Sequence, residues 1–159
     1  MGATLRPQAA SEHAVRLFDS GFNCAESAVT AVLEAIGRDA SHAQRMATAF
    51  GAGLARRGGA CGAVSGAAMA LSSLLGRSDP QDDEGKERVY AAVLALAARI
   101  EAVHGSVECR RLTGLDFNDP ESHETFKVSV RADVCVKVLS LAVATALELL
   151  ASAPAAAKS

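Results

Sequence analysis

Four cysteines are the residues of this 159-residue sequence best suited to chemistry: Cys24, Cys61, Cys109 and Cys135. Their thiolates attack electrophiles, form disulfides and bind soft metal ions. Successive cysteines are 37, 48 and 26 residues apart, so the sequence contains no Cys-x-x-Cys pair. Local zinc and thioredoxin-type motifs need such close pairs, and any site shared by these cysteines must therefore be assembled by the fold.

Each cysteine falls at or near the predicted beginning of a helix, where unpaired N–H groups and the helix dipole favour a thiolate. The predicted starts are Asn23 before Cys24, a glycine-rich segment before Cys61, Ser106 before Cys109, and Asp133 before Cys135. At the first of these, Glu26 follows Asn23 by three residues and completes a capping box. We therefore expect redox-active thiols with a lowered pKa, directed into the interior of the protein.

The glycine-rich segment is the second feature that indicates a site. Five glycines occur between residues 51 and 62, which would be costly inside a helix and predicts a loop of special backbone geometry. Small residues around Cys61 allow backbone N–H groups to come close to a sulfur atom or a cluster. We therefore assign Gly59, Gly62 and Gly66 as candidate cofactor-binding positions.

The elements that position these residues are predicted to be helices. Apolar residues recur at intervals of three and four in at least four segments, and glycines end most of them. The expected fold is an all-α, compact bundle of five to six helices, with the glycine loop before the fourth. We expect a polar surface loop over residues 115–124, one domain over residues 1–152, and a disordered tail over 153–159.

Composition limits the partners and the location. The net charge of −2 provides no basic field for nucleic acid. The most apolar stretch, residues 134–151, contains Lys137 and Glu148, so we expect a buried helix and not a membrane span. The first residues lack the pattern of a secretory signal, and we expect a cytoplasmic protein.

Apolar residues on more than one side of the last predicted helix suggest a further partner. They include Val136, Val138, Leu141 and Val143, and a single core need not cover them all. A homodimer through alanine-rich helix faces is therefore expected, in addition to an unidentified redox partner protein.

Four segments of the sequence together resemble a known family. They are GFNCAESA at 21–28, RGGACGAVSG at 57–66, CRRLTG at 109–114, and Cys135. This pattern is similar to the redox-active family named for its C_GCAxxG_C_C signature, and the resemblance extends from about Phe18 to Leu150. All four cysteines match the signature, with none left over. The resemblance implies a helical protein with redox-active cysteines, but it implies no particular reaction.

Three functions remain open from the sequence. The first is electron transfer or sensing by an iron–sulfur cluster on the four cysteines, since four thiolates are the usual ligand set. The second is a thiol–disulfide oxidoreductase or redox sensor that uses cysteine pairs without a metal. The third is a structural zinc site. We expect the four sulfurs to meet in one pocket. A cluster would hold all four within a few ångströms, whereas a dithiol site would bring two near bonding distance with the other two nearby.

Overall fold

The computed structural model describes residues 6–154, and this part of the chain is all-α, as predicted. Six α-helices have seven residues or more: α1 (Pro7–Asp19), α2 (Cys24–Ala35), α3 (Ser41–Ala47), α4 (Gly62–Leu75), α5 (Asp83–His104) and α8 (Val136–Ser152). Shorter elements are α6 (Cys109–Thr113), α7 (Pro120–Thr125), the 3₁₀ turn η1 (Thr48–Phe50) and the π-helix η2 (Phe126–Cys135). Most of the predicted tail, residues 155–159, lies outside the described residues.

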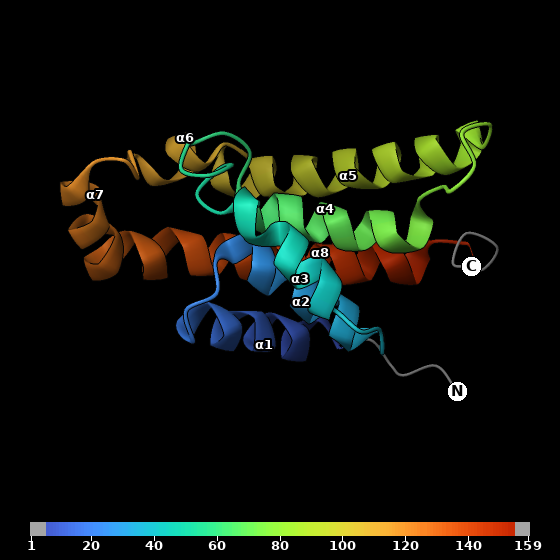
Figure 1. The fold of residues 1–159 in the computed structure, drawn as a ribbon, viewed down its shortest axis with the longest axis horizontal. Coiled ribbons are helices and arrows are strands. Elements are labelled where there is room, and N and C mark those ends of the chain that lie inside the picture. The colour runs from blue at the N-terminus through green and yellow to red at the C-terminus, as the bar shows by residue number, and fades with distance from the viewer. Residues whose placement is uncertain (1–5, 155–159) are drawn as a thin grey trace.

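The bundle is built around α2 and α8. Helices α5, α4, α8 and α1 lie in succession across the molecule, and α2 packs against α1, α4 and α8 (Figure 1). Eight of the twelve residues of α2 are buried. The largest fully buried side chains are aliphatic, among them Leu71, Leu96, Ile100 and Leu139. The core therefore consists of closely packed aliphatic helix faces with few aromatic rings.

Small residues allow α2 and α4 to approach closely at their beginnings. A Cβ atom added at Gly66 of α4 would lie 2.3 Å from the carbonyl oxygen of Ala25 in α2. Ala25 and Ala63 are fully buried nearby. Because Cys24 is the first residue of α2 and Cys61 immediately precedes α4, the packing brings the two cysteines to the same end of the bundle.

The segment after α6 differs from the prediction. Pro120 begins helix α7, and Asp119 caps it by accepting a hydrogen bond from Glu121 N–H. The expectation of a loop over residues 115–124 is therefore wrong in its second half. The reason is local: an aspartate followed by proline is an N-cap followed by a residue suited to the first helical position.

From Pro120 the chain remains helical to Ser152 through α7, η2 and α8. By length and composition alone this run is long and apolar enough to cross a membrane, and 44% of its most apolar window is buried in the described chain. Core helices of soluble proteins meet the same criterion, so it is weak evidence for a span. Here α8 packs against α1, α4, α5 and α2.

The apolar residues that suggest a homodimer are partly covered by this packing. Val138 and Val143 are buried within the chain itself, whereas Val136 and Leu141 are half-buried. The homodimer stays a prediction, with less uncovered surface on α8 than the sequence indicates.

Candidate functional site

Cys24 is the first residue of α2, and the predicted capping box holds the beginning of that helix. The Asn23 side chain accepts hydrogen bonds from the N–H groups of Ala25 (2.9 Å) and Glu26 (3.0 Å). The Glu26 carboxylate in turn accepts one from Asn23 N–H at 2.7 Å. The Asn23 amide also donates to the Thr48 carbonyl oxygen at 3.0 Å, which ties the cap to the segment after α3. The Cys24 thiol is therefore held at a rigid helix N-terminus.

The glycine-rich loop has the special backbone geometry predicted for it, and in an extreme form. Residues 52–56 all have positive φ values, between 49° and 69°. Four of these five are not glycine: Ala52, Leu54, Ala55 and Arg56. Left-handed backbone costs about 1–2 kcal/mol per non-glycine residue and normally occurs at single positions. This left-handed turn directs the Ala52 N–H group to the Cys24 sulfur, where it helps to lower the thiol pKa.

Cys61 and Cys109 are joined through their backbones. Cys61 is the N-cap residue of α4, and Cys109 is the first residue of α6. Three hydrogen bonds connect the two strand-like segments: Cys61 N–H to Val107 O (2.7 Å), Cys109 N–H to Gly59 O (2.7 Å), and Arg110 N–H to Gly58 O (3.0 Å). Two cysteines that are 48 residues apart in the sequence are thereby fixed as neighbours across one short ladder.

Cys135 lies in a different environment from the one predicted. The sequence suggests a helix start capped by Asp133, but Cys135 is the last residue of the π-helix η2, inside the continuous helical run. It therefore lacks the N–H groups of a free helix N-terminus. A π-helix is rare and is often found at functional sites, because it changes the direction of the side chains that follow it.

The Cys24 thiol has a pKa lowered to about 7. The largest cause is a hydrogen bond with the Cys61 thiol, followed among the lowering effects by the N–H groups of Ala52, Cys24 and Ala25; burial opposes them. The pKa of Cys61 is raised well above its ordinary value, first by the same hydrogen bond, then by burial and by the charge of Cys24. The N–H groups of Ala63 and Val64 also act on Cys61, but they do not offset the effects that raise its pKa. Cys24 is therefore the thiolate of the pair, because it accepts the hydrogen bond from Cys61 and those of three backbone N–H groups.

The other two thiols remain protonated at neutral pH. Burial and the charge of Cys24 raise the pKa of Cys109 to about 11, against weaker lowering by Thr113 and Arg110. Burial and the charges of Cys24 and Cys109 raise the pKa of Cys135 to about 12. Both thiols are thus near enough to Cys24 to respond to its charge, and all three line one cavity.

The three candidate glycines have three different roles. A Cβ added at Gly62 would lie 2.5 Å from the Cys24 sulfur, so the absence of a side chain there makes room for that sulfur. Gly59 accepts the hydrogen bond from Cys109 N–H. Gly66 lies against the backbone of Ala25 and serves the packing of α2 on α4, away from the sulfur contact. Of the three, only Gly62 lies directly against a sulfur atom.

The arrangement does not fit a metal centre. Within residues 6–154, no group of three or more histidine, cysteine, aspartate or glutamate side chains is placed to hold a metal ion. An iron–sulfur cluster and a structural zinc site both need four ligands in most proteins. All four cysteines are free of disulfides. The geometry is that of one interacting thiol pair with two further thiols nearby.

Sequence reasoning missed the aromatic and charged residues around the sulfurs. The cavity beside Cys24, Cys109 and Cys135 is also lined by four phenylalanines and by Arg131. Arg131 forms an ion pair with Asp19 of α1 and stacks 4.5 Å above the Phe18 ring. One signal was available: the chain has only five phenylalanines, and its other apolar residues are nearly all aliphatic. The residues that line the cavity come from segments far apart in the sequence, so their proximity is visible only in the folded structure.

Comparison with known proteins identifies a family whose model matches most of the chain. Residues 22–149 match the model of the family described as "Putative redox-active protein (C_GCAxxG_C_C)". No curated protein and no solved structure matches the chain. The matched range includes all four cysteines and most of the described helices. The chain therefore belongs to the C_GCAxxG_C_C family of redox-active proteins.

Proposed function

We propose that this protein is a two-electron redox protein in which Cys24 and Cys61 cycle between a dithiol and a disulfide. The observation that carries the proposal is the hydrogen bond between the Cys24 and Cys61 thiols, which is the largest cause of the lowered Cys24 pKa of about 7. At neutral pH this gives one attacking thiolate beside one protonated thiol, which is the pairing that thiol–disulfide chemistry needs.

The two cysteines have different roles in this proposal. Cys24, which is half-buried, attacks the oxidant, because its thiolate is stabilised and reachable from the cavity. Cys61, which is buried, then attacks the Cys24 sulfur and completes the disulfide. Formation of the disulfide from one thiolate and one thiol releases two electrons and one proton. The acceptor takes up the electrons, and the reverse reaction with a reductant restores the dithiol.

Cys109 and Cys135 are supporting thiols in this scheme. Their raised pKa values keep them protonated while Cys24 carries the charge. These two further thiols, which line the cavity together with Cys24, can exchange with the first pair once it has been oxidised. We assign the first oxidation to Cys24 and Cys61 because only these two share a hydrogen bond.

The test is to map disulfides in protein held at defined ratios of reduced to oxidised glutathione. The protein is purified under anaerobic conditions, trapped with an alkylating reagent, digested and analysed by mass spectrometry. We expect the Cys24–Cys61 disulfide to be the first to form. The Cys109→Ser variant is the matched control and should still form it, whereas Cys61→Ser should accumulate Cys24 joined to glutathione.

Two outcomes would refute the proposal. One is the absence of a Cys24–Cys61 disulfide at every glutathione ratio. The other is anaerobically purified protein that contains stoichiometric iron and sulfide, with a visible absorbance that disappears in all four cysteine variants. The second outcome would support the iron–sulfur alternative, although the described residues are not arranged for it.

A further inference from the structure

A cavity of about 540 Å³ opens beside the reactive cysteines. Three of the four cysteines line it: Cys24, Cys109 and Cys135. Its other walls come from the end of α1, the loop before α7, and η2. Pockets that enclose small organic ligands have volumes of about 300–1,000 Å³. The cavity is thus large enough for a small molecule that reacts with the Cys24 thiolate.

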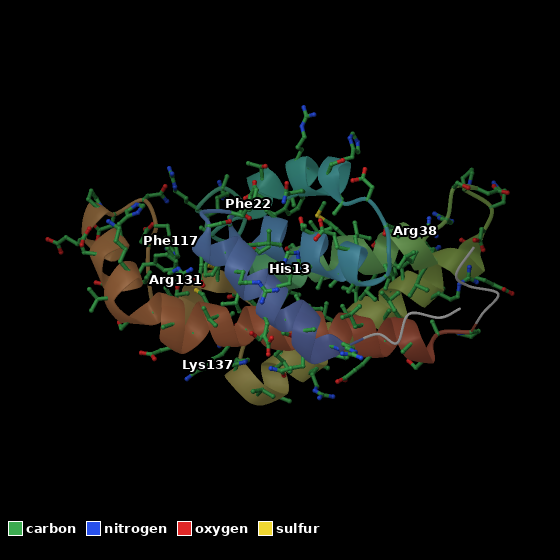
Figure 2. The ribbon with its side chains drawn as sticks, turned by 90° about the horizontal axis from the view of Figure 1, so that it is seen from below. His13, Phe22, Arg38, Phe117, Arg131 and Lys137 are labelled. Carbon is green, nitrogen blue, oxygen red and sulfur yellow. The ribbon has the colours of Figure 1, made fainter. Side chains whose placement is uncertain are left out.

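The aromatic side chains of the protein are concentrated at this cavity. Four of its five phenylalanines line the cavity: Phe18, Phe22, Phe117 and Phe126. The chain has no tryptophan, and its single tyrosine is not among the lining residues. Figure 2 shows Phe22, Phe117 and Arg131 gathered at the same end of the molecule, where α1 meets the orange segment. In a protein whose core is aliphatic, this grouping requires its own explanation.

Core packing alone does not explain the phenylalanines. None of the four is buried, and Phe22 is 38% exposed. The rings of Phe117 and Phe126 meet edge to face with centroids 5.4 Å apart, and those of Phe18 and Phe126 do so at 6.4 Å. Rings that served only to fill the interior would be buried with no open space beside them, because protein interiors leave few voids larger than a water molecule. Here they border an open cavity.

The charge at the cavity favours a ligand with electron-rich oxygen atoms. Its lining includes two cations, Lys127 and Arg131, and one carboxylate, Asp19. Arg131 is held by its ion pair with Asp19 and by stacking on Phe18, so its guanidinium group is fixed in place. A fixed guanidinium group donates hydrogen bonds to carbonyl or ionised oxygen atoms.

We propose that this cavity binds a planar aromatic two-electron acceptor of the quinone class, which oxidises the Cys24–Cys61 pair. The phenylalanine edges and faces suit a flat ring, the two cations suit its carbonyl oxygens, and the Cys24 sulfur lies in the wall. The inference rests on the dithiol function proposed above and names its oxidant. Reaction with a protein disulfide needs no cavity lined by aromatic rings, which is why we assign a small molecule.

The reaction balances with this acceptor. The Cys24 thiolate adds to the quinone ring, and a carbon–sulfur bond forms. Cys61 then loses its proton and attacks the Cys24 sulfur, so that the sulfur–sulfur bond forms and the carbon–sulfur bond breaks. The electron pair of that bond stays on the ring. With one proton from Cys61 and one from solvent, the quinone leaves as a hydroquinone, and the protein leaves as the disulfide.

The test separates binding from oxidation. Duroquinone is the probe, because its four methyl groups prevent permanent arylation of thiols. Binding is measured with the Cys24→Ser variant by ligand-observed NMR, since this variant cannot complete the oxidation. The Phe126→Leu change in that background should weaken binding about fivefold, the order expected for loss of an aromatic contact. Phe50→Leu, which alters the one phenylalanine outside the cavity, is the matched control and should leave binding unchanged.

Oxidation is measured with the reduced wild-type chain under anaerobic conditions. We expect one hydroquinone for each Cys24–Cys61 disulfide. In Lys127→Gln the rate of oxidation by duroquinone should fall by a larger factor than the rate with diamide, a general thiol oxidant. If diamide yields the disulfide but duroquinone neither binds nor reacts, the quinone inference is wrong and the dithiol function stands. If duroquinone binds but no oxidant yields the disulfide, the dithiol function fails. Equal weakening by Phe126→Leu and Phe50→Leu would show that the ligand is not in this cavity.

Discussion

Replacement of Cys61 by alanine should remove most of the reactivity of Cys24 at neutral pH. The hydrogen bond from Cys61 is the largest cause that lowers the Cys24 pKa from 9.0 to about 7. At pH 7 a thiol with a pKa of 7 is about half ionised, and one with a pKa of 9 is about 1% ionised. The full loss would therefore reduce the thiolate population about fiftyfold. The variant keeps the N–H groups of Ala52, Cys24 and Ala25, so we expect the Cys24 reaction rate at pH 7 to fall about tenfold to fiftyfold.

The assay is the rate of Cys24 alkylation by iodoacetamide between pH 5 and 10, followed by mass spectrometry of the Cys24 peptide. The wild-type profile should rise with a midpoint near 7, and the Cys61→Ala midpoint should move toward 9, with similar rates at pH 10. Cys109→Ala is the control. Its thiol is protonated at pH 7, so the Cys24 midpoint should not move. A wild-type midpoint near 9, or the same midpoint in Cys61→Ala, would refute this account of the site.

Three further predictions concern stability and geometry. The folded protein favours the protonated thiols of Cys109 and Cys135, whose pKa values are raised to about 11 and about 12. Their contribution to stability is fully present below pH 9 and is lost as the pH rises toward those values. Urea unfolding should thus show stability falling above pH 9, by about 1.4 kcal/mol per pH unit for each thiol, with a shallower fall in Cys135→Ala; an identical slope would contradict this. Gly62→Ala should displace the Cys24 sulfur and raise the alkylation midpoint, because its Cβ would lie 2.5 Å away; an unchanged midpoint would contradict the contact. Leu54→Gly should raise the free energy of unfolding by about 0.5–1 kcal/mol, because Leu54 is exposed and has a φ of 69°. Gly53→Ala should lower the free energy of unfolding, because an added Cβ would lie 2.6 Å from the Gly59 nitrogen. A less stable Leu54→Gly variant would show that the left-handed turn is not strained.

The parts of the site that sequence could predict are those set by local interactions. The capping box of Asn23 and Glu26 lies within four residues and placed Cys24 correctly at the beginning of α2. The glycine content of residues 51–62 predicted an irregular loop, and the loop is irregular. These features depend on backbone hydrogen bonds and allowed φ values near the residues themselves, which are readable in one sequence.

The parts that could not be predicted depend on distant segments. The interval of 48 residues between Cys61 and Cys109 gives no sign of the backbone ladder that joins them. Asp133 looks like a cap for Cys135, but the helix has already begun at Pro120 and continues through η2. A capping residue inside an established helix has no free N–H groups to accept from. The helix that begins at Pro120 continues through Asp133, so the capping pattern there does not begin a new helix.

The left-handed turn explains how one of four similar cysteines becomes the thiolate. Cys24, Cys61 and Cys109 all lie at helix beginnings, so the helix dipole alone does not distinguish them. Cys24 differs because the turn adds the Ala52 N–H group to those of its own helix, and because the Cys61 thiol donates a hydrogen bond to its sulfur. Once Cys24 is ionised, its charge raises the pKa of the other three thiols. The left-handed turn, which holds the Ala52 N–H group at the Cys24 sulfur, thus adds to the larger effect of the Cys61 hydrogen bond in making Cys24 the nucleophile.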